Sequence, residues 1–284
     1  MSAVPLRRRL DRLSASLLAA ALAIVVLVWT LAPIAWMVVS SVKPTAAIKT
    51  ASPTWFFEPT LEHYQDLIGA GNDVRPFAKN SLVAAGLSTA LAVTLGALGG
   101  YGLAHWHHRS KRHLAFWIIS TRMAPIAAVI LPLFILFRQL GLIDSLLGLT
   151  LAYLSFNLPF AIWLMSAFFA DVPPSLEEAA RVDGCTRWQA FWHVVLPTTT
   201  PGLVTTAVLC LVFSWNDYAF ASSFSGPGSQ TLPMAAGRLI TQGGVDWGQL
   251  TALGTLIVLP MVFAGLAVRR WLVTGLTLGA VTGE

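Results

Sequence analysis

The sequence predicts an all-α integral membrane protein with six transmembrane helices. Of its 284 residues, 56% are hydrophobic and only 11% are charged, which is unlike the composition of an ordinary soluble domain. The hydrophobic residues gather in stretches of about 20, the length at which a helix crosses the hydrocarbon core of a bilayer. The short alternating segments typical of membrane β-barrels do not occur in the sequence. A bundle of membrane-spanning helices is therefore the expected fold.

Six apolar stretches account for the expected spans. Four contain no charged residue, whereas the third contains Arg122 and the fifth contains Asp217. The expected spans are 17–39, 82–104, 114–137, 146–170, 203–224 and 250–268. They define a transmembrane domain over 17–270, preceded by an N-terminal segment (1–16) and followed by a C-terminal tail (271–284). A long polar loop over 171–200 joins the fourth span to the fifth.

The positive charges in the loops predict the orientation. Six spans place both termini on one side of the membrane, and the loops of that side carry eleven Lys and Arg residues against six on the other side. The eleven are Arg7, Arg8, Arg9, Arg12, Arg109, Lys111, Arg112, Arg181, Arg187, Arg269 and Arg270, and the six are Lys43, Lys49, Arg75, Lys79, Arg138 and Arg238. Positively charged loops stay in the cytoplasm, so both termini and the 171–200 loop are expected there. The net charge of +5 then reflects topology and does not imply a nucleic-acid partner.

Sequence motifs for catalysis and metal binding are missing. The chain has no phosphate-binding loop of the nucleotide-hydrolysing type, no H-E-x-x-H or G-x-S-x-G motif, and no paired cysteines. Cys185 in the loop and Cys210 in a span do not suggest a disulfide. Four histidines cluster with cations over 105–113, where a metal site is conceivable, but the neighbouring positive charges favour a basic turn at the membrane surface. We therefore expect no enzyme activity, cofactor or metal on this chain.

The 171–200 loop is expected to form a bent pair of short helices. Ser175 and Glu178 have the spacing of a capping box that opens the first helix, and Thr186 and Gln189 have the same spacing at the second. Gly184 lies between them, where a helix often ends on a left-handed residue. A loop that only returned the chain to the membrane needs far fewer residues. This one is expected to bind another protein.

The two expected helices of the loop differ in character. The first is acidic and carries Ala179 and Ala180, whose small side chains allow a partner to approach closely. The second is expected to end at Pro197. Its apolar face at helical spacing is formed by Trp188, Phe191, Trp192 and Val195. The alternative is an amphipathic helix that lies on lipid, but the acidic first helix opposes binding to a negatively charged membrane surface.

Small residues and prolines predict how the spans pack. Ala92, Gly96 and Gly100 recur every four residues in the second span, a spacing that lets helix backbones approach closely. Prolines inside the third, fourth and sixth spans are able to kink their helices, and they are Pro125, Pro132, Pro159 and Pro260.

Ionisable residues inside spans are costly and usually face the bundle interior or an aqueous path. Asp217 follows Asn216 near the outer end of the fifth span, and Arg122 lies about one third of the way into the third span from its cytoplasmic end. Each charge has two interpretations, either a structural partner for neighbouring helices or part of a solute pathway. Arg122, Asn216 and Asp217 are the candidate pathway residues.

Residues 178–197 follow a fixed pattern of E-A-A, three residues, G, nine residues, an aliphatic residue, one residue and L-P. The fixed positions are Glu178-Ala179-Ala180, Gly184, Val194 and Leu196-Pro197. This pattern resembles the signature loop of permease subunits in binding-protein-dependent ABC importers. Further matches are similar to the carbohydrate branch of that family and, within it, to the second, six-span permease. They are 80–82 (NSL), 99–104 (GGYGLA), 121–125 (TRMAP), 215–217 (WND) and 271–281 (WLVTGLTLGAV).

The resemblance implies an ATP-driven importer that moves a sugar or polyol across the bacterial inner membrane. Two copies of a cytoplasmic ATPase would bind ATP and Mg²⁺, so no cofactor is expected on this chain. A second permease and an external solute-binding protein would complete the assembly, with substrate crossing between the two permeases. The loop would dock on the ATPase through Glu178, Ala179, Ala180, Asp183, Gly184, Leu196 and Pro197.

Other functions stay open at this point. The signature loop is shared across the superfamily, so the solute is open to alternatives such as glycerol phosphate. An ATP-independent carrier or channel would use Arg122 and Asp217 as coupling charges and would be indifferent to Glu178. A membrane enzyme is a more distant alternative, because docking accounts for the acidic cluster in the loop.

Overall fold

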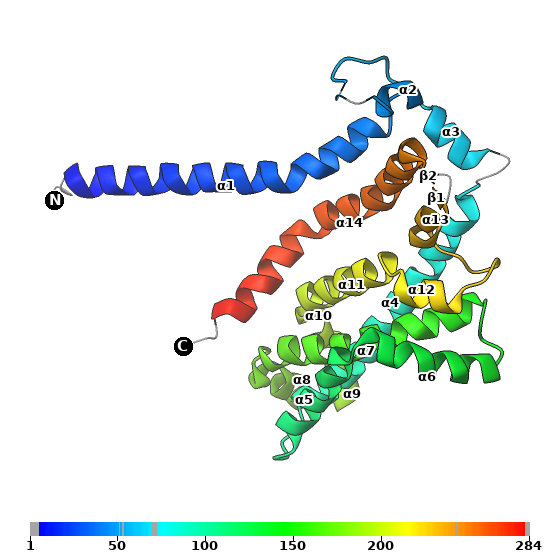
Figure 1. Ribbon diagram of the computed structural model, residues 1–284. Helices are drawn as coiled ribbons and strands as arrows, with labels where there is room; N and C mark the ends of the chain where they lie inside the picture. Colours follow the sequence, from blue (N-terminus) through cyan, green and yellow to red (C-terminus); the bar gives the residue numbers. More distant parts are fainter. Residues whose placement is uncertain (1–5, 51, 53, 70–72, 242–243, 282–284) are drawn as a thin grey trace. The chain divides into compact units, whose positions relative to one another are not determined.

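The computed structural model describes residues 6–50, 52, 54–69, 73–241 and 244–281 (Figure 1), with side chains described from residue 16 to residue 269 except residue 241. Helices dominate this part, and its strands are β1 (Ile240–Thr241) and β2 (Gly244–Val245), which pair antiparallel. The predicted all-α class is confirmed. The ends of the two predicted terminal segments, residues 1–5 and 282–284, lie outside the described residues.

The described chain forms two compact units. The first contains the described residues before Asp73 together with residues 239–256, and the second contains residues 73–238 and those from 257 onward. The first unit holds α1 (Leu6–Ser40), α2 (Thr45–Ile48), α3 (Glu62–Ile68) and the first turns of α14 (Trp247–Val281). Buried His63 organises this unit, since its Nε2 lies 2.8 Å from the carbonyl oxygen of Lys43 and its ring packs directly on Gly248.

The centre of the second unit is the pair α4 (Arg75–Ala104) and α7 (Leu146–Ala170), with α11 (Thr200–Trp215) packed on both. Ala92 is fully buried against α7 and α11. A Cβ atom built on Gly96 would lie 2.6 Å from the Cβ of Ala161, and one built on Gly100 would lie 2.8 Å from the Cβ of Met165. The predicted close approach through small residues is confirmed.

Alanine at Gly100 is expected to destabilise the protein. The new methyl group would sit 2.8 Å from Met165 Cβ and from the backbone nitrogen of Ser166, and α7 has no flexible group there to move aside. Overpacking of this kind costs roughly 1–3 kcal/mol. Gly102 is the matched control because its Cβ would meet nothing within 4 Å, and Gly→Ala in an open helix position gains up to about 1 kcal/mol. Thermal unfolding in lipid nanodiscs should move Tm down for Gly100→Ala and up for Gly102→Ala, and equal shifts would contradict the packing account.

Membrane spans occur as straight helices and as bent pairs. By length and composition, the helices long and apolar enough to cross a membrane are Ser16–Ser40, Arg75–Ala104, Leu146–Ala170 and Trp247–Arg269. Two further pairs qualify only when their halves are taken together: Lys111–Met123 with Ile126–Gln139, bent by 87°, and Arg187–Thr198 with Thr200–Trp215, bent by 74°. The described residues thus contain four candidate spans, or six if each bent pair is one span.

The region of the expected third span is broken near its middle. Helix α5 (Lys111–Ser120) passes through a 3₁₀ turn (Thr121–Met123) and stops, and α6 (Ile126–Gln139) starts with Pro125 as its N-cap. Ala124, the residue before the proline, is extended with ψ 134°, as the proline ring requires. Pro132, by contrast, lies inside α6 without ending it.

Asp144 anchors the loop that follows α12 (Ala219–Phe224) and leads to α13 (Leu232–Arg238). Its Oδ1 accepts hydrogen bonds from the backbone N–H groups of Gly226 (2.9 Å), Gly228 (3.1 Å) and Ser229 (3.0 Å) and from the Ser229 hydroxyl (2.8 Å). Desolvation raises the pKa of the Asp144 carboxyl, but these hydrogen bonds outweigh it and hold the pKa below its usual value. Asn80 and Ser81 fix the rest of the loop through bonds to Gly228, Gln230 and Leu232.

Loss of the Asp144 charge is expected to free the 226–229 loop. Because the folded-state pKa is depressed, the carboxylate stabilises the loop above its unfolded pKa, and this contribution is lost as pH falls through the folded value. Asp144→Asn keeps the shape and suits the positive φ of 55° at this position. The protection factors of the 226–229 amides, which correct for the slower intrinsic exchange in acid, should fall in Asp144→Asn and, in the unmodified chain, as pH falls below the usual aspartate pKa of about 4. Asp73→Asn, an exposed carboxylate paired only with Arg75, is the control; unchanged exchange in Asp144→Asn would show that the backbone alone holds the loop.

Candidate functional site

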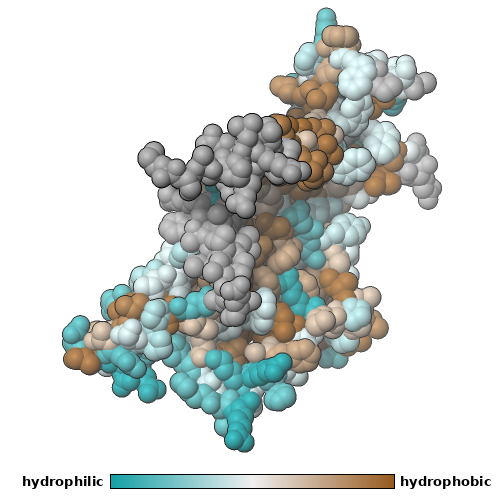
Figure 2. Space-filling view, turned by 90° about the vertical axis from the view of Figure 1, so that its left-hand side faces the viewer, coloured by the Kyte–Doolittle hydropathy of each residue, from teal (hydrophilic) through white to brown (hydrophobic). Residues whose placement is uncertain are grey.

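The 171–200 loop forms the predicted bent pair of helices. Helix α8 (Pro174–Val182) ends before Gly184, whose φ of +93° confirms the predicted left-handed turn. Helix α9 (Arg187–Ala190) opens with the predicted capping box, in which the Gln189 N–H donates to Thr186 Oγ1 at 3.3 Å and the Thr186 N–H donates to Gln189 Oε1 at 2.8 Å. Figure 2 shows hydrophilic side chains gathered at the lower end of the second unit, the end at which α5, α8 and α9 lie in Figure 1.

Two predicted boundaries in the loop are wrong. Ser175 does not cap the first helix; α8 begins one residue earlier, at Pro174, with Pro173 as N-cap and no side-chain cap. Proline suits the first helical position because its φ is preset and its missing N–H would have no partner there. The second helix ends one residue later than predicted. The π turn Phe191–Val195 precedes Pro197, and α10 (Leu196–Thr198) continues one residue past it before the chain bends by 74° into α11. The wider turn accommodates the proline ring and its missing donor.

The predicted apolar face of the second helix is split between the protein interior and its surface. Phe191 and Val195 are buried and pack with Met165, Phe169 and Ala97. Trp188 is 58% exposed and Trp192 is also exposed, although both rings touch Phe191. The regular helical period predicts a single continuous stripe, whereas in the structure Phe191 and Val195 face the interior and Trp188 and Trp192 lie at the exposed edge of the same face.

The predicted docking residues fall on different faces of the loop. Glu178, Ala179, Asp183, Gly184 and Pro197 are exposed, Leu196 is half-buried, and Ala180 is buried within this chain. Leu176 and Val182, the latter 87% exposed, extend the outer surface of α8 with apolar groups. We call the exposed residues Leu176, Glu178, Ala179 and Val182 the outer face of α8. It is a small-residue and apolar surface with one carboxylate, that of Glu178, which also borders the pocket described below.

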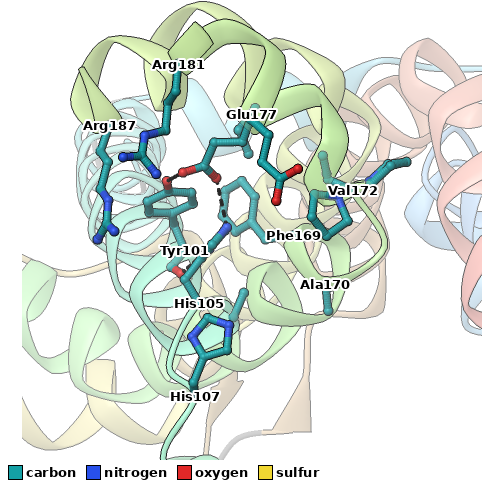
Figure 3. Close-up of a pocket in the computed structure, with 14 residues that line it drawn as sticks. Tyr101, His105, His107, Phe169, Ala170, Val172, Glu177, Arg181 and Arg187 are labelled. Atoms are coloured by element: carbon teal, nitrogen blue, oxygen red, sulfur yellow. Dashed lines mark hydrogen bonds and ion pairs between the residues drawn. The ribbon is translucent and has the colours of Figure 1, made fainter. Parts of the chain in front are cut away.

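The inner side of α8 is tied to α4 by residues that sequence reasoning missed. The Tyr101 hydroxyl donates to Glu177 Oε1 at 3.0 Å, and His105 Nε2 lies 2.9 Å from Glu177 Oε2 (Figure 3). The other ring nitrogen of His105 lies 3.0 Å from the Tyr101 carbonyl oxygen. Both ring nitrogens of His105 therefore lie at hydrogen-bond distance from an oxygen atom. We call these three residues the Tyr101–His105–Glu177 cluster.

This cluster forms one wall of a pocket of about 420 Å³ at the start of the loop (Figure 3). Arg181 and Arg187 line the same pocket from α8 and α9, and the Tyr101 ring packs 4.6 Å from Phe191 between centroids. Among the described residues, no group of three His, Cys, Asp or Glu side chains is placed to hold a metal. The contacts of Glu177 with Tyr101 and His105, together with the packed aromatic rings, therefore join α8 to α4.

Arg122 lies in the 3₁₀ turn between α5 and α6, inside an aromatic enclosure. Its guanidinium carbon is 4.3 Å from the ring centroid of Phe156, 4.4 Å from that of Phe160 and 4.1 Å from that of Phe213. No described residue forms an ion pair with it. Cation–π contacts of this kind are worth up to about 2 kcal/mol each when water is excluded. Arg122 thus joins the sharp bend to α7 and α11.

Asp217 caps a helix and borders a small cavity. Its Oδ1 accepts from the N–H groups of Phe220 (3.0 Å) and Ala221 (3.1 Å), which opens α12. The cavity, about 80 Å³, is also lined by Tyr153, Asn157, Ser214 and the rings of Phe156 and Phe213. Those two rings contact Arg122 as well. The structure therefore brings Arg122 and Asp217 to the same pair of rings, whereas Asn216 is exposed and donates to Val212.

A buried polar chain leads away from this cavity. Asn157 Nδ2 donates to Ser214 Oγ at 2.7 Å, and Ser214 bonds Ser88 at 3.0 Å. Asn157 Oδ1 and Tyr153 Oη are buried without a hydrogen-bond partner in the described chain. Buried polar atoms are normally satisfied, and a water molecule in this cavity would be able to satisfy these two.

Comparison with known proteins identifies the family. The chain matches the binding-protein-dependent transport system inner membrane component over residues 92–277. It is 35% identical to the trehalose transport system permease protein SugB of Mycobacterium tuberculosis, covering 90% of this chain and 93% of that protein. It is 32% identical to the diacetylchitobiose uptake system permease protein DasC of Streptomyces coelicolor, covering 92% and 95% respectively.

A solved structure supports the fold. A chain of the bacterial ABC transporter involved in import of the acidic polysaccharide alginate is similar with a TM-score of 0.69 at 22% identity, covering 95% of this chain and 99% of that chain. Together with the loop pattern at Glu178–Pro197, these findings make the assignment plain: the chain belongs to the family of binding-protein-dependent transport system inner membrane components, the permease subunits of ABC importers.

Proposed function

We propose that this chain is a permease subunit that imports a sugar or polyol across the bacterial inner membrane, driven by partner ATPases that dock on the outer face of α8. One observation carries the coupling part of the proposal. On adjacent positions of one helix, Glu177 is tied inward to α4 while Glu178 is exposed with Ala179 beside it. The helix is thus anchored to the membrane bundle on one side and open to a partner on the other.

The relatives support the substrate class. Their names describe trehalose and diacetylchitobiose uptake, and a further relative at 27% identity, from Thermococcus litoralis, is a trehalose/maltose transport system permease protein. A saccharide is therefore the proposed solute. The partners we propose are a second permease, two ATPase copies that bind ATP and Mg²⁺, and an external solute-binding protein, with both termini of this chain in the cytoplasm.

The solute pathway is proposed to run along the cavity side of Asp217. At about 80 Å³ the cavity has room for a few water molecules and not for a sugar ring. The pathway must therefore widen during transport or lie between this chain and the second permease. In this proposal Asp217 and Arg122 form part of the wall of the pathway without binding the solute, because the Asp217 carboxylate already caps α12 and the Arg122 guanidinium is already enclosed by aromatic rings. Asn216 is the exposed polar group of the three.

Co-purification tests the assembly. The tagged chain is extracted from its native membrane in mild detergent, its companions are identified by mass spectrometry, and ATP hydrolysis is measured. A second permease and an ATPase should accompany it, and uptake of labelled trehalose, diacetylchitobiose, maltose and glycerol 3-phosphate by cells should select the saccharides. A chain that emerges alone would overturn the assembly, and selection of glycerol 3-phosphate would overturn the substrate.

A further inference from the structure

The first unit contains a pocket that none of the sites above involves. Its volume is about 450 Å³. It lies where α1 ends, beside α2, the segment after it and the first turns of α14. The polar and aromatic side chains that line it include Trp36, Ser40, Lys43, Thr54, Trp247 and Thr251.

Two polar side chains of this pocket are more than nine-tenths buried and have no hydrogen-bond partner among the described residues. Lys43 is 3% exposed, and its ammonium lies 4.4 Å from the ring centroid of Trp36 and 5.3 Å from that of Phe57. Within the described chain it has no carboxylate at ion-pair distance. Ser40 is 7% exposed, and no described residue bonds its hydroxyl. A buried charge is costly unless it is paired, and aromatic faces repay only part of that cost.

The other polar groups of the wall offer acceptors. The hydroxyl of Thr54 donates to the carbonyl of Ala47 at 3.1 Å, and that of Thr251 donates to the carbonyl of Trp247 at 2.8 Å. Their hydrogens are therefore used, and their oxygen lone pairs remain for a ligand hydroxyl. None of the described residues that line the pocket is acidic. The pocket thus combines a cationic donor, the Lys43 ammonium, with hydroxyl acceptors on Thr54 and Thr251. The ammonium suits a negatively charged oxygen of a ligand, and the hydroxyl acceptors suit ligand hydroxyl groups.

The position of the pocket further restricts the class of ligand that it is able to bind. Trp36 lies near the end of the candidate span Ser16–Ser40, and Trp247 begins the candidate span Trp247–Arg269. Both rings are partly exposed, as is usual for tryptophans at the membrane–water boundary. Lipid phosphates lie at this depth.

We propose that this pocket binds a phosphate carried by a hydroxylated group, with the Lys43 ammonium and the Ser40 hydroxyl as donors to the phosphate oxygens. The same chemistry has two sources, the glycerol-phosphate headgroup of an anionic lipid and a soluble glycerol phosphate. The site is separate from the coupling loop and does not depend on which solute the importer carries.

Lipid retention tests the proposal. The purified importer complex is exchanged into nanodiscs of phosphatidylglycerol and phosphatidylcholine, and tightly bound lipid is counted by native mass spectrometry. Lys43→Met should lower retained phosphatidylglycerol at least tenfold, whereas Lys49→Met, an exposed lysine of the same segment, should retain it. Lys43→Arg should restore retention, because a guanidinium also binds phosphate. Circular dichroism melting checks that Lys43→Met is folded.

A second arm separates the two sources. Glycerol 3-phosphate is titrated into lipid-depleted complex, and protection of Tm is measured. Protection by the soluble phosphate that Lys43→Met removes would assign the site to a soluble ligand, and retention of phosphatidylglycerol alone would assign it to lipid. Equal retention and equal protection in Lys43→Met and the unmodified chain, or no binding in either arm, would overturn the proposal.

Discussion

Replacing Glu178 by lysine is expected to abolish ATP-driven uptake while leaving the chain folded. Glu178 is exposed on the outer face of α8, and its side chain bonds no described residue. A lysine there would present a positive charge to the cleft of the ATPase, where we propose a basic residue meets Glu178. Like-charge contacts and lost charge pairs at interfaces cost roughly 2–5 kcal/mol, so ATPase recovery and uptake should fall about 30-fold or more.

Asp171→Lys is the matched control for this experiment. Asp171 is an exposed carboxylate at the start of the same loop, directly after α7, and its reversal changes the net charge equally. The control should retain both ATPase recovery and uptake. Normal uptake in Glu178→Lys would contradict the proposal that Glu178 contacts the ATPase. Equal losses of uptake in Glu178→Lys and Asp171→Lys would show that the overall charge of the loop matters instead.

Replacing Glu177 by glutamine is expected to uncouple the importer without releasing the ATPase. The Glu177 side chain contacts Tyr101 and His105 and is not part of the outer face of α8, so binding of the ATPase to that face should survive. Loss of its charge weakens the contacts with Tyr101 and His105, through which we propose that movement of α8 reaches α4. Coupling free energies between sites are typically 1–3 kcal/mol, so transport should fall about tenfold while ATP hydrolysis continues. The readout is the number of ATP molecules hydrolysed per solute imported.

Tyr101→Phe provides a graded comparison for Glu177→Gln. It removes one hydrogen bond of the cluster and keeps the ring contacts with Phe169 and Phe191. The ratio of ATP to solute should rise less than in Glu177→Gln. If Glu177→Gln instead loses the ATPase as Glu178→Lys does, Glu177 contacts the partner and the two acids share one role.

Much of the fold is readable from the sequence because a bilayer allows few solutions. Length and hydropathy predict the helices, and the four-residue spacing of Ala92, Gly96 and Gly100 predicts that another helix packs closely on α4; the structure shows that this helix is α7. Local capping rules also predict the Thr186 box and the turn at Gly184. These features depend on neighbours in sequence and on backbone geometry, which a single chain displays.

The features that sequence missed depend on groups far apart in the chain. Glu177 reads as half of an acidic pair, and only the fold shows that Tyr101 and His105 reach it across 76 and 72 positions of separation. The adjacent acids Glu177 and Glu178 could have predicted two different roles, because neighbouring positions of a helix face different directions. A proline in an apolar stretch likewise does not reveal whether the preceding helix stops before it, as at Pro125, or passes through a π turn and one residue beyond it, as at Pro197.

The candidate pathway was partly predictable. A charge inside an apolar stretch singles out Arg122 and Asp217, but not what satisfies each. The structure places an aromatic enclosure around the first and a helix start at the second, with Asn157 and Tyr153 between the same helices. Neither polar residue is unusual in sequence, because Asn and Tyr are common in spans and near their ends.

Uptake by the purified complex in liposomes tests the central claim most directly. The complex of this chain with its partner permease and ATPase is reconstituted, its binding protein is added outside, and entry of labelled trehalose is followed with and without ATP inside. The account predicts accumulation only with ATP, and its loss in Glu178→Lys. Trehalose entry through this chain alone, without ATP and unchanged by Glu178→Lys, would contradict it.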